Sequence, residues 1–212
     1  MLRRVRGLLR RLSTVRYDSR FFTEGWFKNW AELAPVLLSM LTLEQTWRAY
    51  LDYGCGPGVM IDPMNDRGFR YIGCDVSPQP RQLYLQRFGK YPDRYVASLE
   101  EVAGQRFDVL VMFDVLEHLR NEEVTHLLQQ ARGIPEVLAN ISREPGIPGH
   151  INIQSDASWI EFFRSEGWSF DEAHTKKLRH LYLTLRPAGP DLWHRNLFLF
   201  RRRVSEAREP TA

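Results

Sequence analysis

Three glycines alternate in the segment YLDYGCGPG, residues 50–58, directly behind a short apolar run. Glycines at this density let the backbone come close to a ligand, and a strand, a glycine loop and a helix together form a common nucleotide-binding entrance. The spacing differs from two phosphate-binding versions of this entrance. The dinucleotide fingerprint G-x-G-x-x-G would place its third glycine where Val59 stands, and no Lys-Ser/Thr pair follows as in a P-loop. The pattern here is G-x-G-x-G, at Gly54, Gly56 and Gly58, preceded by Asp52.

A second group of polar residues closes the apolar segment FDVLVMFDVLEHL, residues 107–119. Asp114, Glu117 and His118 have the spacing i, i+3, i+4, which predicts that they begin a helix and share one of its faces. They could supply a base for an acceptor hydroxyl, or ligands for a divalent metal. The plainer interpretation is that the acid satisfies the helix start while His118 fills the edge of a pocket. His150 is a further candidate, either for substrate contact or as a loop histidine bonded to backbone.

The elements that must position these residues alternate between strands and helices. The fourth apolar run, residues 107–115, contains almost no polar residue, which is typical of a strand buried on both faces of a parallel sheet. Proline is expected to break a helix at Pro35 and to interrupt a short helix at Pro63. Two alternating stretches, 169–185 and 192–203, flank a Pro/Gly turn and predict an antiparallel pair. Strands are expected over residues 48–54, 69–75, 93–98, 107–115 and 136–142, with helices between them.

This alternation predicts an α/β fold with a Rossmann-like, doubly wound sheet, mostly parallel and closed by an antiparallel C-terminal hairpin. In such sheets ligands bind at the carboxyl ends of the strands, at the point where the strand order reverses. The glycine loop and the residues after 113 both follow strands at that edge. The sequence therefore predicts one site that contains both groups.

The length of 212 residues, with 43% hydrophobic and 26% charged residues, predicts a single domain over residues 17–203 with a flexible tail at 204–212. Residues 1–16 form a basic amphipathic arm with six arginines and no acid, so the net charge of +3 conceals a body that carries 23 basic residues against 26 acidic ones. A body that is not basic makes a nucleic-acid partner unlikely on charge grounds.

Two cysteines, Cys55 and Cys74, are too few for a disulfide framework or a four-ligand zinc site, and a cytoplasmic location is expected. The arm has three interpretations. It would suit peripheral contact with an anionic membrane, it has the Arg-rich, acid-free character of a mitochondrial transit peptide, and it also fits a solvated arm.

The segment YLDYGCGPG resembles motif I of the class I S-adenosylmethionine-dependent methyltransferases, and three further segments extend the resemblance in order. They are the strand end at Asp75, the segment VASLEEV at 96–102, and FDVLVMFDVLEHL. The resemblance implies the seven-stranded methyltransferase fold, with S-adenosyl-L-methionine (SAM) as cofactor and S-adenosyl-L-homocysteine as product. It implies that Asp75 accepts hydrogen bonds from the ribose hydroxyls. The cofactor-binding residues it implies are Asp52, Gly54, Cys55, Gly56, Gly58, Asp75, Val76, Ser98, Leu99 and Phe113.

In the same family the N-terminal segment often folds over the cofactor as a lid. Residues 17–43 are the equivalent segment here, and its aromatics would exclude water from the site. Packing of these aromatics onto the sheet is the alternative. The aromatic residues concerned are Phe21, Phe22, Trp26, Phe27 and Trp30.

The segment DVLEH also resembles the acid-x-x-Glu-His motif of ubiquinone-pathway O-methyltransferases and of small-RNA 2′-O-methyltransferases, where a metal is involved. Glu-His is also very common in relatives that use no metal, and a metal is not favoured. The catalytic candidates are His118, Asp114 and His150. The expected function is methyl transfer to the hydroxyl of a small molecule, such as a sugar or glycan, a phenol or a lipid-like acceptor. The alternatives are a metal-assisted RNA 2′-O-methyltransferase and a methyltransferase-like binding partner without catalysis.

Overall fold

The structure, a computed structural model, describes residues 21–44, 46–186 and 193–203. The predicted basic arm at 1–16 and the predicted tail at 204–212 lie outside the described residues, and the cytoplasmic location stays a prediction. Across the described ranges, no helix combines the length and the apolar character that crossing a bilayer requires.

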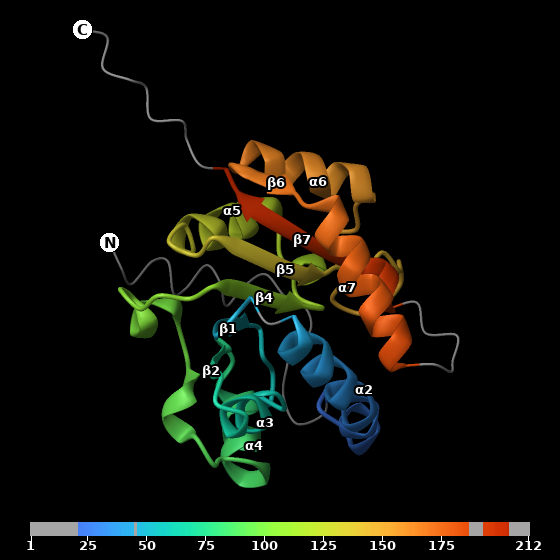
Figure 1. Ribbon diagram of the computed structural model, residues 1–212. Helices are drawn as coiled ribbons and strands as arrows, with labels where there is room; N and C mark the ends of the chain where they lie inside the picture. The colour runs from blue at the N-terminus through green and yellow to red at the C-terminus, as the bar shows by residue number, and fades with distance from the viewer. Residues whose placement is uncertain (1–20, 45, 187–192, 204–212) are drawn as a thin grey trace, which may run out of the picture.

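One seven-stranded sheet forms the centre of the molecule, in the strand order β3-β2-β1-β4-β5-β7-β6 (Figure 1). Strands β1 to β5 run parallel, whereas β7 is antiparallel to both β5 and β6. The predicted doubly wound, mostly parallel sheet with antiparallel C-terminal strands is confirmed. The strands are β1 (Ala49–Tyr53), β2 (Arg70–Cys74), β3 (Tyr95–Val96), β4 (Val109–Phe113), β5 (Glu136–Asn140), β6 (Trp168–Phe170) and β7 (Leu197–Arg202).

Helices cover both faces of this sheet, with α5 and α6 on one side and α2 and α3 on the other (Figure 1). All five residues of β4 are buried, as its uninterrupted apolar run predicts, and alternate residues belong to the two core clusters on opposite faces. The strand order reverses between β1 and β4, so the loops that follow these two strands meet at the same edge. The helices are α2 (Glu24–Leu43), α3 (Ile61–Asp66), α4 (Pro78–Arg87), α5 (Asn121–Gln130), α6 (Asp156–Ser165) and α7 (Glu172–Leu185).

The predicted C-terminal hairpin is wrong in its first half. In this part of the chain β6, Trp168–Phe170, pairs with β7, but the chain then forms the 14-residue helix α7 before it returns. The side chain of Asp171 caps this helix by accepting a hydrogen bond from the backbone N–H of His174 at 2.9 Å. Thr175, Leu178 and Tyr182 are buried at intervals of three and four residues. The same apolar pattern thus fits one face of a helix, and packing against α2 and β7 decides in favour of the helix.

The two expected proline breaks are also wrong. Helix α2 runs for 20 residues with Pro35 in its interior, and buried leucines follow the proline on the face that meets the sheet. Burial of that face outweighs the one hydrogen bond that a proline removes. Pro63 lies in the first turn of α3, where a backbone N–H has no partner within the helix in any case, so it does not interrupt the helix.

Leu178 and Leu183 of α7 test the helical register. Leu178 is fully buried and Leu183 is 46% exposed. We expect Leu178→Ala to lower the free energy of unfolding by about 2–5 kcal/mol, because it leaves a cavity in the core. Leu183→Ala should change that free energy by less than about 0.5 kcal/mol. Urea unfolding followed by far-ultraviolet circular dichroism measures both, and equal losses would contradict the register.

Candidate active site

The glycine loop, residues 54–58, leaves the end of β1 in a conformation that only glycine adopts readily. Gly54 has φ 77° and Gly56 has φ 53°, both in the left-handed region. A Cβ atom on Gly54 would lie 2.5 Å from a methyl carbon of Val115, so the loop and the chain after β4 are in direct contact. This contact brings the glycine loop next to the second group of predicted residues.

Asp75, directly after β2, holds the tip of the loop. Its Oδ2 accepts a hydrogen bond from the backbone N–H of Gly56 at 3.1 Å, and its Oδ1 accepts one from Ser77 at 2.8 Å. The Tyr95 hydroxyl donates to the Gly56 carbonyl at 2.7 Å, so Gly56 is held at both its N–H and its carbonyl group. Burial raises the pKa of Asp75, and the N–H groups of Ser77 and Gly56 oppose that rise. Val76 stands beside this carboxylate with 61% of its surface exposed.

Asp52 lies inside β1 and is almost completely buried. Its Oδ2 accepts a hydrogen bond of 2.8 Å from the hydroxyl of Tyr71 on the neighbouring strand β2. Burial raises the pKa of Asp52 to about 7, the Tyr71 hydrogen bond opposes the rise, and the nearby charge of Asp75 adds to it. Asp52 is therefore a carboxyl group whose ionisation responds to a positive charge brought close to it.

The remaining predicted cofactor-binding residues differ in how far their side chains are buried. Ser98 and Leu99 are half-buried at the start of a 3-10 turn, Leu99–Val102, that follows β3. Cys55 is half-buried, and burial raises the pKa of its thiol well above the usual value. Phe113 is buried, and its ring packs edge-on against Trp193 with centroids 5.1 Å apart. The Phe113 ring thus belongs to the core.

The aromatic segment, residues 21–30, covers the glycine loop. Phe22 is buried, and its ring lies 3.4 Å from the position that a Cβ atom on Gly56 would take; the Trp26 ring lies 3.9 Å from the same point. Phe22 and Trp26 pack edge to face with centroids 4.9 Å apart, and Trp26 in turn contacts Phe27 and Trp30. The start of the N-terminal segment therefore lies over the loop, while the later leucines of α2 pack onto the sheet.

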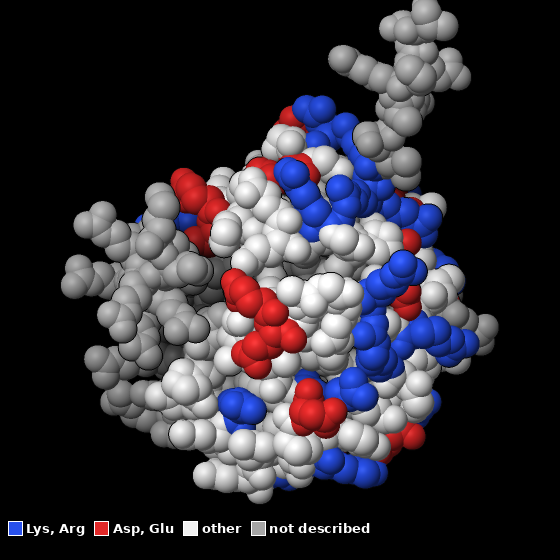
Figure 2. Space-filling view, turned by 90° about the vertical axis from the view of Figure 1, so that its left-hand side faces the viewer, with Lys and Arg blue, Asp and Glu red and all other residues white. Residues whose placement is uncertain are grey.

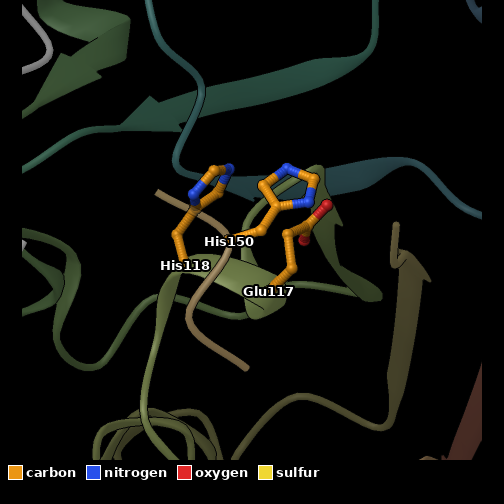
Figure 3. Close-up of side chains that lie close together, drawn as sticks. All are labelled: Glu117, His118 and His150. Carbon is orange, nitrogen blue, oxygen red and sulfur yellow. The ribbon is translucent and has the colours of Figure 1, made fainter. Parts of the chain in front are cut away.

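The predicted helix start at Asp114, Glu117 and His118 is wrong. Residues Leu116–His118 form a single 3-10 turn, and α5 begins only at Asn121. Asp114 precedes the turn with φ 54° and is exposed, so the three side chains do not share a helical face. The structure instead brings His150 to Glu117 and His118 (Figure 3).

We call Glu117, His118 and His150 the Glu-His-His cluster. Their donor atoms all lie within 4.8 Å of one another; in Figure 3 Glu117 and His118 extend from the turn, and His150 reaches them from a neighbouring segment. The His118 and His150 rings are 4.8 Å apart between centroids, at an angle of 80°. His150 lies in the segment between β5 and α6, and backbone N–H groups of the two residues after it donate to the Glu117 carbonyl at 2.9 and 3.0 Å. Those bonds hold this segment against the 3-10 turn.

Glu117 has no exposed surface. Its Oε1 accepts a hydrogen bond from the backbone N–H of Ser142 at 3.0 Å, whereas its Oε2 has no hydrogen-bond partner within the described part of the chain. Burial raises the pKa of Glu117 to about 8, and the charge of Asp114 contributes to the rise. Burial also lowers the pKa of His118, which keeps its imidazole neutral at pH 7. The resemblance to metal-dependent relatives raises the question of a divalent cation, and a buried carboxylate oxygen without a partner beside two imidazoles fits one.

A cavity of about 360 Å³ lies between α2 and α3. Apolar side chains line it, among them Phe27, Trp30 and Val59, with Arg67 as its single charged residue. Phe27 and Trp30 are two of the predicted lid aromatics, whereas none of the predicted catalytic or cofactor-binding residues lines the cavity.

Similarity to known proteins identifies the family of this chain. A family model described as a methyltransferase domain matches residues 20–135, which is more than half of the chain. The chain belongs to the methyltransferase domain family. Residues 20–135 include the aromatic segment, the glycine loop, Asp75 and the 3-10 turn with Glu117 and His118.

Among curated proteins, a ubiquinone biosynthesis O-methyltransferase of Dechloromonas aromatica is 30% identical over 103 residues, which are 45% of this chain and 44% of that protein. A protein of the same name from a Methylobacterium species is 34% identical over 92 residues, covering 41% of this chain and 34% of the relative. The chain thus spans less than half the length of these methyltransferases.

Solved structures show the same fold at lower identity. A TehB-like SAM-dependent methyltransferase from Corynebacterium glutamicum superimposes with a TM-score of 0.57 at 17% identity, over 85% of this chain and 97% of that one. The magnesium protoporphyrin IX methyltransferase of Synechocystis, crystallised with bound SAM, gives a TM-score of 0.55 at 15% identity and covers 81% of this chain and 79% of the other.

The raised pKa of Asp52 predicts how stability depends on pH. The folded state keeps this proton to about pH 7, whereas the unfolded chain loses it near the ordinary value of 3.8. The folded state therefore binds more protons between these values, and one such group lowers the free energy of unfolding by up to about 1.4 kcal/mol per unit of rising pH. We expect Asp52→Asn, which retains an acceptor for Tyr71, to flatten this slope in urea unfolding between pH 5 and 7.

The control is Asp93→Asn, which removes an acid whose side chain is 74% exposed and should leave the slope as in the wild type. Glu117 contributes a similar decline up to about pH 8, so Asp52→Asn reduces the slope without abolishing it. An unchanged slope in Asp52→Asn would contradict the assignment.

Proposed function

We propose that this chain is a SAM-dependent methyltransferase that methylates a hydroxyl group of a small molecule. The observation that supports the proposal is the direct contact between Gly54 and Val115, because it brings the glycine loop beside the turn that bears Glu117 and His118. A loop of this type alone would support binding only. The neighbouring imidazoles add groups that can receive the proton that an acceptor hydroxyl loses.

Residues of the glycine loop would hold the cofactor, with Asp75 at the ribose and Val76, Ser98 and Leu99 at the adenine. Bound SAM supplies a methyl group on an activated sulfonium. The Asp75 carboxylate already accepts two backbone hydrogen bonds, and each of its oxygens retains a second lone pair for a hydroxyl. Asp52 would provide negative charge for the ammonium group at the methionine end of SAM. That positive charge would in turn favour the ionised form of the Asp52 carboxyl group.

The chain's own part in transfer is to align the reactants and to accept one proton. Holding two reactants in line supplies roughly 7–11 kcal/mol of a barrier of this kind. His118 and His150 are the candidate proton acceptors, with Asp114 outside their cluster. Phe22 and Trp26 cover the glycine loop and would exclude water from the bound cofactor.

The hydroxyl acceptor is supported by the relatives named as O-methyltransferases of ubiquinone biosynthesis. Surface charge also favours a small molecule over RNA. On the face shown in Figure 2, basic side chains gather along one side and acidic ones lie across the middle, so this face carries charges of both signs, whereas a phosphate backbone attracts a predominantly basic surface.

Gly56 and Gly68 form a matched pair for the test of cofactor binding. Both have left-handed φ angles, 53° and 80°, so alanine costs each roughly 1–2 kcal/mol of backbone strain. Only Gly56 lies in the loop; a Cβ atom on Gly68 meets nothing within 4 Å. In calorimetric titration with SAM, we expect the wild type and Gly68→Ala to bind alike and Gly56→Ala to bind at least ~10-fold more weakly, a loss of about 1.4 kcal/mol. Absence of binding to folded wild-type protein would overturn the proposal.

Phe22 and Phe21 test the cover over the cofactor. Phe22 is 7% exposed and faces the loop, whereas its neighbour Phe21 is 36% exposed. We expect Phe22→Ala to weaken SAM binding by about 1 kcal/mol, roughly fivefold, and to speed its dissociation, because apolar contact with the ligand is lost. Phe21→Ala should have a smaller effect in the same stopped-flow experiment. Equal effects of the two variants would contradict a role specific to Phe22.

A further inference from the structure

We propose that the cavity between α2 and α3, called here the α2–α3 cavity, binds a small amphiphilic anion, an aliphatic chain that ends in a carboxylate. We further infer that this ligand strengthens the binding of SAM. Binding of the anion is independent of the proposed function, whereas its effect on SAM rests on that function.

The α2–α3 cavity has a buried floor and an open mouth. Leu38 is 7% exposed and Val59 is half-buried, so these two residues line the inner part. Phe88 is 41% exposed and Arg67 is also exposed, so these two lie where the cavity opens to solvent. The volume of about 360 Å³ is that of a ligand pocket, and every lining residue except Arg67 is apolar. An aliphatic chain in the cavity would remove this apolar surface from water.

Arg67 selects the charge of the ligand. Its Nη1 donates a hydrogen bond to the Pro63 carbonyl at 3.0 Å, and Arg67 forms no ion pair with a described residue. The adjacent acid, Asp66, is instead paired with Lys90 and accepts a hydrogen bond from the Tyr91 hydroxyl at 2.8 Å. A guanidinium group has five N–H donors in a planar fork that matches a carboxylate. The carboxylate would therefore lie at the mouth, beside Arg67, with the chain directed inward.

The walls of the α2–α3 cavity are shared with the cover over the glycine loop. Phe27 and Trp30 line the cavity, and their rings contact Trp26 with centroids 5.1 and 5.5 Å apart. The Trp26 ring lies 3.9 Å from the position that a Cβ atom on Gly56 would take. A ligand in the cavity would thus pack against the aromatic residues that hold Trp26 over the loop. Because coupling between two sites is reciprocal, SAM should strengthen binding of the anion by the same factor.

Calorimetric titration of the full chain tests the ligand class with three amphiphiles of equal chain length, each kept below its micelle concentration. They are decanoate, decanol and decyltrimethylammonium. We expect one equivalent of decanoate to bind, and decyltrimethylammonium to bind at least ~10-fold more weakly because its charge repels Arg67. Arg67→Gln should remove this preference. Arg132→Gln, at an exposed arginine outside the cavity, is the matched control and should retain it.

Ala34→Leu tests the location, because Ala34 lines the cavity and a leucine there would occupy its space. We expect this variant to lose decanoate binding at least ~10-fold. The control, Ala157→Leu, places the same side chain at an exposed position of α6 and should bind decanoate like the wild type. Far-ultraviolet circular dichroism and thermal unfolding check that both variants are folded. Wild-type affinity in folded Ala34→Leu would overturn the site, and equal affinity for the three amphiphiles would overturn the ligand class.

Titration with SAM at saturating decanoate measures the coupling. We expect the affinity of the wild type for SAM to rise about fivefold, the lower end of typical coupling between sites, and that of Ala34→Leu to be unaffected by decanoate. An unchanged SAM affinity in the wild type would overturn the coupling. If decanoate binds as described but SAM does not bind, the proposed function fails and the anion site stands. If SAM binds but decanoate does not, the anion site fails and the proposed function stands.

Discussion

The structure of the candidate site depends on how closely the backbone at Gly54 approaches Val115. At that point the end of β1 and the chain after β4 are neighbours, because the order of the strands reverses between them. A side chain at position 54 would collide with Val115, so this edge closes only around glycine. The glycine loop, Asp75 and the 3-10 turn with Glu117 are consequently held on one side of the sheet. The proposed chemistry requires that proximity.

Buried acids give the site its electrostatic character. Asp52 and Glu117 both lie in the interior, and burial is the main cause of the raised pKa of each. Each carboxyl is retained at a cost to stability at neutral pH, which is typical of residues that serve a ligand. Asp52 stands on the side of the glycine loop and Glu117 on the side of the histidines.

The N-terminal segment shows features of both arrangements that the sequence left as alternatives: part of it lies over the glycine loop, and part of it packs onto the sheet. Phe22 and Trp26 lie over Gly56, whereas Leu37, Met40 and Leu41 of the same region are buried against the sheet. Continuity of α2 through Pro35 joins Trp26 and these core residues in one helix, whereas Phe22 precedes that helix.

Local patterns in the sequence were sufficient for the sheet, the glycine loop and the position of Asp75. Apolar runs of strand length and glycines at fixed spacing act over a few residues, so they can be read without the fold. The same patterns misassigned residues 172–185, because leucines and tyrosine at those positions satisfy a strand and a helix alike, and only packing against α2 and β7 separates the two. They also grouped Asp114 with Glu117 and His118, because a helix was assumed where the chain makes a single 3-10 turn.

The partnership of His150 with that turn was decided by tertiary structure alone. His150 lies 32 residues beyond His118 in the sequence, and backbone hydrogen bonds from the segment that follows it to the Glu117 carbonyl bring the two together. Residue types and short spacings thus determined the fold class and the candidate cofactor loop. The identity of the third member of the cluster required the folded chain, because long-range contacts leave no periodic trace in the sequence.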